Sequence, residues 1–346
     1  MVDGRWSLDI GNSSYLGSVV NAQSNIFGHE SVHHVVRMKP RAIEPGDRIG
    51  VIAPASTPLD DKQFQAGLNR LKSLGFEIEL GRSDVKAHGY LAGDDNERAA
   101  ALNSMLNRND CSAIICARGG YGSLRLLDMI DYEAARANPK ILVGYSDITA
   151  LHFALFERAG WYGLSGPMIA SDWPHIGMAS EKLFWDLAAG GWTGELLGPD
   201  GEKLLGTRSG TAEGFLVGGN LSVITALVGS RYMPAMEGAI LFIEDVNEPP
   251  YRIDAYLAHL KLSGVLGKLG GLVVGKFTGW EPEKGEPTLS YEEVIDHYTQ
   301  YVHGPVAVGL VYGHVPVKNT MPVGVRALLD VIDTEASLQI LESVTR

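Results

Sequence analysis

A serine lies where an apolar stretch meets a helical pattern in "ILVGYSDITALHFAL", residues 141–155. Ser146 and Asp147 could cap the helix, because their side-chain oxygens accept hydrogen bonds from the free N–H groups of a first turn. The join could also be a nucleophile elbow, which holds a serine hydroxyl above a sheet beside those same N–H groups. The stretch alone favours the helix cap, so a catalytic serine must be argued from partners elsewhere in the chain.

A nucleophilic serine needs a histidine to take its proton and a carboxylate to orient that histidine. Most histidines of this chain lie in predicted helices, in polar loops or near the N-terminus, and His303 in "YVHGPV" is a weak candidate. His314 follows the strand-like segment "GPVAVGLVYG", and the end of a buried strand is where sites are built. A capping or exposed loop histidine would fit this position equally well.

The carboxylate is expected in "AILFIEDVNEPPYRID", where the apolar residues 240–243 lead into Glu244 and Asp245. Alternation along a strand puts these two acids on opposite faces, so at most one of them points into a cleft. An acid placed directly after a buried strand needs a partner such as an imidazole N–H, because burial of an unpaired charge is unfavourable. Glu248, beyond the strand, is expected to be solvated.

A glycine-rich loop, "ARGGYGS" at residues 117–123, follows another apolar strand. Glycines let the backbone approach a ligand and present its N–H groups. The loop lacks the Lys-Ser/Thr of a P-loop and the spacing of a dinucleotide fingerprint. We interpret it as half of an oxyanion hole, with the second N–H from Asp147, although a plain glycine turn is at least as compatible with the motif.

The elements that must position these residues alternate between strand and helix from Arg48 to about residue 159. Apolar strands such as "RIGVIAPAS" and "CSAIICA" are separated by amphipathic patterns such as "DDKQFQAGLNRLKSLG". This order predicts an α/β fold with a Rossmann-like parallel sheet. The loops at residues 53–58, 118–123 and 144–147 should then lie together on one edge of that sheet.

Beyond residue 185 the chain becomes rich in glycine and then shows short strands, such as "GAILFIEDV" and "LGGLVVGKFT", and one clear helix. We therefore predict a smaller, strand-rich C-terminal domain. The predicted division is a loosely ordered extension over 1–43, a nucleophile-bearing domain over 44–185, a linker over 186–209 and a domain carrying the acid and the base over 210–346.

The composition excludes several classes of partner. With 29 Lys and Arg against 41 Asp and Glu, the net charge is −12, which argues against binding to nucleic acid or to an anionic membrane surface. No apolar stretch approaches the roughly 18 residues that span a bilayer. Cys111 and Cys116 lie five positions apart, and this odd offset on a strand points them to opposite faces, so a disulfide or shared metal is not expected. We expect a cytoplasmic protein that needs no metal and no cofactor.

Seven segments, in order, resemble the LD-carboxypeptidases, the muramoyl-tetrapeptide carboxypeptidases, and the related microcin-C immunity peptidases. They are "GDRIGVIAPAS", "YLAGDDNERAAALN", "CARGGYGSLRLL", "VGYSDITAL", "GFLVGGNLSVITALVGS", "LFIEDVNEPPYRID" and "GHVPVKNTMPVG". The resemblance covers about residues 44–335. It implies a Rossmann-like N-terminal domain, a smaller strand-rich C-terminal domain and a homodimer.

The resemblance also assigns roles to residues. It makes Ser146 the nucleophile, Glu244 the acid and His314 the base, with the triad closing between the two domains. The oxyanion and substrate-binding region would comprise Gly119, Gly120, Tyr121 and the Asp147 amide.

Two reactions are compatible with the resemblance. The first removes the terminal D-alanine of cytoplasmic murein tetrapeptide. The second cleaves an aminoacyl-nucleotide amide, with Trp173 or Trp280 as candidate stacking residues, although each could be an ordinary surface-loop residue. Without residues 1–37 the chain would have 309 residues, a length that suits the shorter, murein-recycling members and favours the first reaction. A non-catalytic sugar- or nucleotide-binding protein is the alternative from a different class, and the presence of all three triad positions argues against it.

Overall fold

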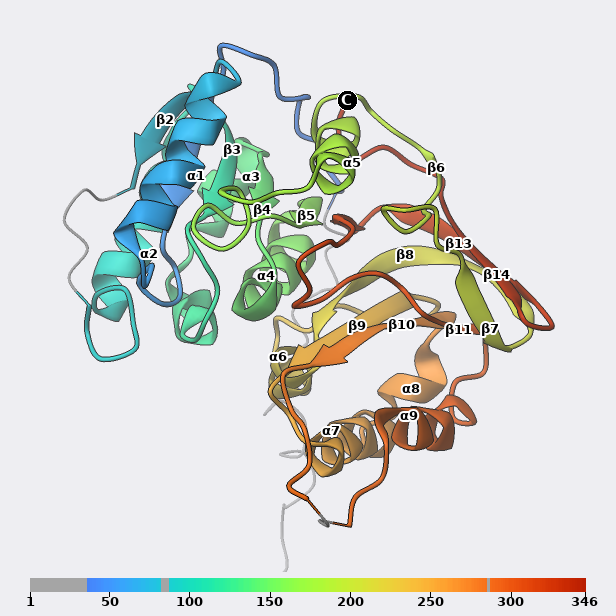
Figure 1. The fold of residues 1–346 in the computed structure, drawn as a ribbon. Helices are drawn as coiled ribbons and strands as arrows, with labels where there is room; N and C mark the ends of the chain where they lie inside the picture. Colours follow the sequence, from blue (N-terminus) through green and yellow to red (C-terminus); the bar gives the residue numbers. More distant parts are fainter. Residues whose placement is uncertain (1–35, 82–86, 285–286) are drawn as a thin grey trace, which may run out of the picture. The chain divides into compact units, whose positions relative to one another are not determined.

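The computed structural model describes residues 36–81, 87–284 and 287–346, and most of the expected N-terminal extension therefore lies outside the described residues. The described part of the chain forms one compact unit. It contains two sheets, each with its own helices (Figure 1).

The first sheet has the predicted βαβ order. Its strands are β1 (Arg48–Ile52), β2 (Glu77–Leu80), β3 (Cys111–Cys116), β4 (Ile141–Val143), β5 (Gly163–Ser165) and β12 (Met321–Val323). The spatial order is β12-β5-β4-β3-β1-β2, and all neighbours are parallel except β12, which runs antiparallel to β5. The parallel Rossmann-like sheet predicted from the sequence is confirmed.

Helices connect these strands. They are α1 (Asp61–Ser73), α2 (Asp95–Asn107), α3 (Tyr132–Ala137), α4 (Thr149–Ala159) and α5 (Met178–Ala188), with short 3-10 turns η1 (Ser123–Met129) and η2 (Ser146–Ile148). Local sequence explains where the longer ones begin. Asp60 caps α1 by accepting the N–H groups of Lys62 and Gln63, and Asp94 forms a capping box with Glu97 at the start of α2.

The second sheet closes on itself. Its strands are β6 (Gly194–Glu195), β7 (Leu204–Arg208), β8 (Gly210–Asn220), β9 (Ile240–Val246), β10 (Gly271–Thr278), β11 (Val306–Val308), β13 (Arg326–Ile332) and β14 (Glu335–Ile340). Because β13 pairs with both β8 and β14, the order β13-β8-β9-β10-β11-β7-β14 forms a barrel-like ring, to which β6 adds at β14. Strands β8 to β11 are mutually parallel.

Four helices accompany this sheet. They are α6 (Leu221–Leu227), α7 (Pro250–Leu262), α8 (Val265–Lys268) and α9 (Tyr291–Thr299). Figure 1 shows α7, α8 and α9 on one side of the sheet, with the first sheet on the other. Within the described ranges, no helix has both the length and the apolar character needed to cross a bilayer.

Residues 36–43 differ from the loose order expected for the extension. The Met38 N–H donates to the Gly160 carbonyl at 3.2 Å, and the Ile43 N–H donates to the Ala188 carbonyl at 3.1 Å. The Ile43 side chain is buried in the core. A short extended segment that buries only one side chain shows no hydrophobic periodicity. The sequence therefore gives no sign that residues 36–43 are ordered.

The C-terminal half of the chain differs in two further ways. The expected linker, 186–209, contains the end of α5 and the strands β6 and β7, which belong to the second sheet. The short strand β12 leaves the predicted C-terminal domain and pairs with β5 of the first sheet. Short strands with glycine or proline carry little periodic signal, so neither feature could be read from the sequence.

Candidate active site

Ser146 lies on a sharp turn between β4 and α4. The three residues of β4 are buried, Gly144 has a φ of +156°, and Ser146 itself has a φ of +64°. A positive φ is uncommon for a residue with a side chain and is found where surrounding structure enforces it. Neither η2 nor α4 has a side-chain cap hydrogen bond, so Ser146 does not act as the helix cap that the sequence alone favoured. The turn has the geometry of a nucleophile elbow.

Three side chains form a continuous hydrogen-bonded chain. His314 Nε2 lies 3.0 Å from Ser146 Oγ, and His314 Nδ1 lies 2.8 Å from Glu244 Oε2. When the serine hydroxyl donates to Nε2, the Nδ1–H donates to the carboxylate. The Glu244 side chain is 0% exposed and that of His314 is 22% exposed, so the acid is shielded while the histidine remains accessible.

Glu244 has a second polar neighbour in Asn220, the last residue of β8. Asn220 Nδ2 donates to Glu244 Oε1 at 3.3 Å and to Asp245 Oδ1 at 2.8 Å. Strand β9 lies parallel to β8 with Asn220 opposite Glu244, which brings these groups together. Gly313 approaches the same carboxylate, since a Cβ at this position would lie 3.0 Å from Glu244 Oε2.

Asp245 has hydrogen-bond partners other than the histidine. Its carboxylate accepts the N–H groups of Ser222 and Val246, each at 2.8 Å. Burial raises the pKa of Asp245 to about 6. This acid therefore organises the end of β9 and the start of α6.

The three loops predicted to share one edge of the first sheet do meet there. The Ser56 N–H donates to the Gly119 carbonyl at 3.3 Å, and the Tyr121 N–H donates to Ser56 Oγ at 3.2 Å. A Cβ on Gly119 would lie 3.2 Å from Ser146 Oγ, so the glycine loop touches the serine. Gly120 has a φ of +116°, and a Cβ there would collide with Ser56 Oγ.

Asp147 connects the glycine loop to the elbow. Its carboxylate accepts the Ser123 N–H at 2.8 Å, directly after the loop. The side chain is buried, and this burial raises its pKa. The structure thus brings Gly119, Gly120 and Asp147 around Ser146, whereas the Tyr121 ring projects outward.

Arg98 was missed by sequence reasoning. Its buried guanidinium donates through Nη1 to the Gly122 carbonyl at 3.0 Å and also to the Pro54 carbonyl, so it joins the two loops beside the serine. Arg98 shares a face of α2 with the core residues Leu102 and Met105. That spacing was the signal that could have marked this arginine as buried.

His152, on α4, is one of the histidines that the sequence places in a predicted helix. It is buried, and its Nε2 lies 2.8 Å from the Gly144 carbonyl, at the start of the elbow. Burial lowers the pKa of His152 to about 4, so at neutral pH the uncharged ring supports the turn.

A buried ion pair, also missed, lies beside the histidine. Lys318 Nζ is 2.6 Å from Asp172 Oδ1 and 2.8 Å from the Tyr145 hydroxyl. The Tyr145 ring in turn lies 5.1 Å from the His314 ring, centroid to centroid. Lys318 follows His314 in the chain, so the pair fastens the histidine-bearing segment to residues of the first sheet's domain.

The expectation that Trp173 is a surface residue able to stack on a base is wrong. Its side chain is buried, its Nε1–H donates to the Pro167 carbonyl at 3.1 Å, and its ring packs against Phe184 of α5 at 5.2 Å. The flanking polar residues and proline suggested an exposed loop, whereas the aromatic face of α5 covers this tryptophan. Trp280 is half-buried in the segment after β10.

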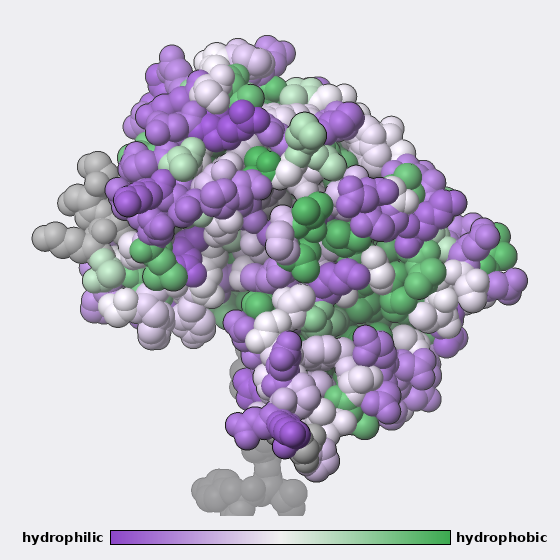
Figure 2. Space-filling view, in the orientation of Figure 1, coloured by the Kyte–Doolittle hydropathy of each residue, from purple (hydrophilic) through white to green (hydrophobic). Residues whose placement is uncertain are grey.

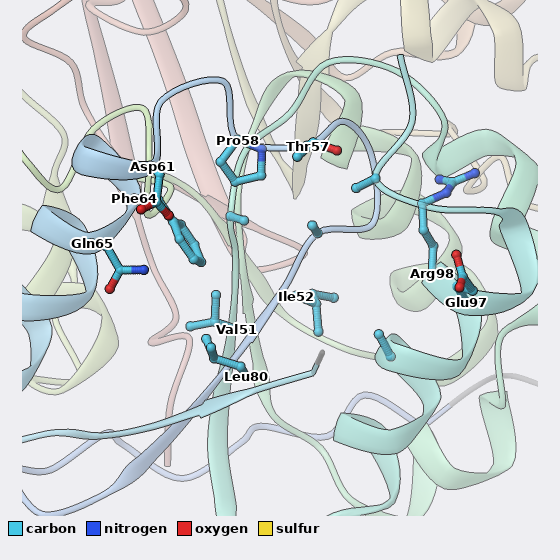
Figure 3. Close-up of a pocket in the computed structure, with 14 residues that line it drawn as sticks. Val51, Ile52, Thr57, Pro58, Asp61, Phe64, Gln65, Leu80, Glu97 and Arg98 are labelled. Carbon is cyan, nitrogen blue, oxygen red and sulfur yellow. The ribbon is translucent and has the colours of Figure 1, made fainter. Parts of the chain in front are cut away.

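A cavity of about 220 Å³ lies at the carboxyl end of β1, between α1 and α2 (Figure 3). Its wall includes Thr57, Phe64 and Arg98, and it is separate from the hydrogen-bonded chain of Ser146, His314 and Glu244. Among the residues that the structure describes, no group of three or more His, Cys, Asp or Glu is placed to hold a metal ion.

Comparison with known proteins gives the same family across both halves of the chain. Residues 49–166 match the family model for the LD-carboxypeptidase N-terminal domain, and residues 213–329 match that for the LD-carboxypeptidase C-terminal domain. The probable murein peptide carboxypeptidase of Bacillus subtilis is 38% identical, over 87% of this chain and 94% of the relative. The microcin C7 self-immunity protein MccF of Escherichia coli is 30% identical, over 86% and 94%.

A solved structure supports the same assignment. The crystal structure of muramoyltetrapeptide carboxypeptidase from Oxalobacter formigenes superposes with a TM-score of 0.75 at 30% identity, covering 85% of this chain and 98% of that one. The chain belongs to the LD-carboxypeptidase family and is a serine-type carboxypeptidase.

Proposed function

We propose that this enzyme hydrolyses the L,D-amide bond that holds the terminal D-alanine of murein tetrapeptide. The observation that carries the proposal is the chain of hydrogen bonds from Ser146 through His314 to Glu244. A serine hydroxyl alone is a weak nucleophile, and this arrangement supplies both the base and the group that orients it.

In the proposed reaction, Ser146 Oγ attacks the carbonyl carbon of the scissile amide while its proton passes to His314 Nε2. The C–N bond then breaks, His314 returns the proton to the leaving amine, and D-alanine departs. Water hydrolyses the acyl-enzyme by the same proton transfers in reverse order. The negative charge on Glu244 stabilises the imidazolium in both steps.

The oxygen of the tetrahedral intermediate needs hydrogen-bond donors near Ser146. We assign this role to backbone N–H groups of the Gly119–Gly120 loop and of Asp147. The contact between Gly119 and Ser146, and the link from Asp147 to Ser123, support this assignment.

Murein tetrapeptide is the preferred substrate for two reasons. The Bacillus subtilis relative and the Oxalobacter formigenes structure are both named for murein or muramoyl peptides. In addition, burial of Trp173 removes one of the two tryptophans that could have stacked on a nucleobase.

A second candidate function, cleavage of an aminoacyl-nucleotide amide, has one observation in its favour. Tyr121 of the glycine loop and Tyr90 are 50% and 64% exposed, with ring centroids 5.4 Å apart. An exposed aromatic pair beside the nucleophile could receive a base by stacking. The similarity to MccF is consistent with this reaction.

The two substrates can be compared directly. The purified enzyme is incubated with murein tetrapeptide and, separately, with a processed microcin-C analogue, and the products are measured by mass spectrometry. We expect loss of D-alanine from the tetrapeptide with the higher kcat/KM. Faster cleavage of the aminoacyl-nucleotide would instead establish the second candidate.

We also propose a cytoplasmic homodimer, as the family resemblance implies. Figure 2 shows a hydrophobic area over the second sheet on a face that is otherwise largely hydrophilic. Leu205 of β7 and Ile332 of β13 are exposed on that sheet. Sedimentation equilibrium should give twice the chain mass, and a monomer at micromolar concentration would contradict this proposal.

A further inference from the structure

A carboxypeptidase works beside the free carboxylate at the end of its substrate. This protein carries a net charge of −12, so its overall field repels such a substrate. A cation near the nucleophile would offset this repulsion, bind the terminal carboxylate and distinguish a chain end from an internal peptide bond.

Arg118 lies at the right place for this task. It follows β3 and precedes Gly119, whose Cβ position would be 3.2 Å from Ser146 Oγ. Adding standard backbone lengths puts the Arg118 Cα within about 9 Å of that oxygen, a gap that an arginine side chain and one substrate residue can span. The guanidinium donates through Nη1 to the Thr57 carbonyl at 3.3 Å, so it lies on the edge where the site loops meet.

Three other cations near these loops are already paired. Lys318 is bound to Asp172, and both Arg98 and Arg125 are bound to Asp95. Arg118, by contrast, has no ion pair with any carboxylate in the described part of the chain, and it is only half-buried. Its remaining N–H donors are thus available for a carboxylate, which a guanidinium can bind with two parallel hydrogen bonds.

We propose that Arg118 binds the terminal carboxylate of the departing D-residue and thereby determines the preference of the enzyme for chain ends. Arg118 is then a specificity residue that contacts the substrate and takes no part in proton transfer. The inference rests on the proposed function, because it assigns a partner to the carboxylate that the proposed substrate carries.

The test uses two substrates that differ only at the carboxylate: murein tetrapeptide with a free C-terminus and the same peptide with a C-terminal amide. The wild type should cleave the acid with a kcat/KM about 100-fold above that of the amide, because a charge-assisted bidentate contact is lost with the amide. Arg118→Gln should reduce cleavage of the acid by about 100-fold and leave cleavage of the amide nearly unchanged. Arg118→Lys, which keeps the charge but loses the bidentate geometry, should lie between them.

Arg125→Gln is the matched control, because this arginine lies near the same loop but is bound to Asp95. It should keep the wild-type preference for the acid. Thermal melting of each variant separates loss of folding from loss of recognition, and the acid-to-amide ratio is measured within each variant.

The outcomes separate this inference from the proposed function. Two results would show that Arg118 does not recognise the carboxylate: Arg118→Gln keeps the wild-type acid-to-amide ratio, or the wild type cleaves both peptides equally well. Either result leaves the L,D-carboxypeptidase reaction standing. If the wild type cleaves neither peptide, the proposed function is refuted and this inference with it.

Discussion

Glu244 and Asp245 are neighbours in the sequence but have different surroundings. The first contacts His314 and is fully shielded from solvent, whereas the second accepts hydrogen bonds from Ser222 and Val246. The alternation of side chains along β9 produces this division. At the scale of single residues, the two acids should therefore have separable effects on catalysis and on stability.

Glu244→Gln should lower kcat by about a thousandfold or more, because the variant keeps the shape of the site but loses the charge that stabilises the imidazolium. Asp245→Asn should lower kcat by less than about tenfold. It should lower the free energy of unfolding by about 1–3 kcal/mol, because an amide cannot accept all the hydrogen bonds that the carboxylate accepts. Steady-state kinetics and urea unfolding measure both effects. A larger loss of kcat in Asp245→Asn would contradict the assignment of Glu244.

The sequence identified the three residues of the hydrogen-bonded chain only with the help of the family resemblance. Its local patterns favoured Ser146 as a helix cap and left His314 equally compatible with a site histidine and a loop histidine, because a single motif does not report distant partners. Trp173 was misjudged for the same reason, since its burial depends on packing against Phe184 rather than on its neighbours in the chain.

At the scale of elements, the turn from β4 to α4 is held in place by contacts with a buried histidine and with the glycine loop. His152 supports it from α4, and the glycine loop after β3 covers it. The strand and helix that form the turn were predictable from the apolar run and the helical period. The supporting contacts were not, because they join elements that are distant in sequence.

His152 should make the protein sensitive to acid. Burial lowers its pKa to about 4, whereas the unfolded chain binds a proton near pH 6.5. The stability that the neutral ring contributes is therefore present above pH 6.5 and is lost as the pH falls towards 4. Between pH 7.5 and 5 the loss should be about 2 kcal/mol.

Urea unfolding of the wild type and of His152→Gln at these two pH values tests this expectation. Glutamine can still donate to the Gly144 carbonyl but does not titrate, and all other groups cancel in the comparison. Equal losses of stability in the two proteins would show that His152 is not the source.

Gly120→Ala should disable the glycine loop. The backbone at this position has a φ of +116°, and the added Cβ would collide with Ser56 Oγ, so the loop that carries Gly119 must shift. We expect a loss of about 100-fold in kcat, the effect of losing one oxyanion donor. Gly177→Ala is the control, because a Cβ there meets no atom within 4 Å. Similar kcat values for the two variants would argue against a role for the loop.

At the scale of the whole molecule, both sheets hold the site. Ser146 follows β4 in the first sheet, and Glu244 lies on β9 in the second. His314 lies on the segment that runs from β11 in the second sheet to β12 in the first. The sequence predicted two domains with strands. It did not predict that the chain returns from the second sheet to the first at β12, because this strand has only three residues and one of them is proline.

The ion pair of Lys318 and Asp172 holds the segment that carries His314 against the first sheet, so its loss should lower both stability and activity. Lys318→Met leaves the Asp172 carboxylate buried without its counter-charge. We therefore expect the free energy of unfolding to fall by about 3 kcal/mol or more. We also expect a lower kcat, because His314 would shift. Adding Asp172→Asn should restore part of the stability. The control is Lys182→Met, which removes an exposed pair with Asp186 and should change stability by less than about 1 kcal/mol. Equal effects of Lys318→Met and Lys182→Met would contradict the coupling.

The most direct test of Ser146 as the nucleophile is the rate at which Ser146→Ala releases D-alanine from murein tetrapeptide, compared with the wild type. The variant lacks only the hydroxyl that lies 3.0 Å from His314 Nε2. We expect a loss of about a millionfold in kcat, with thermal stability and tetrapeptide binding nearly unchanged. A variant that is folded and retains more than about a hundredth of the wild-type rate would show that Ser146 is not the nucleophile.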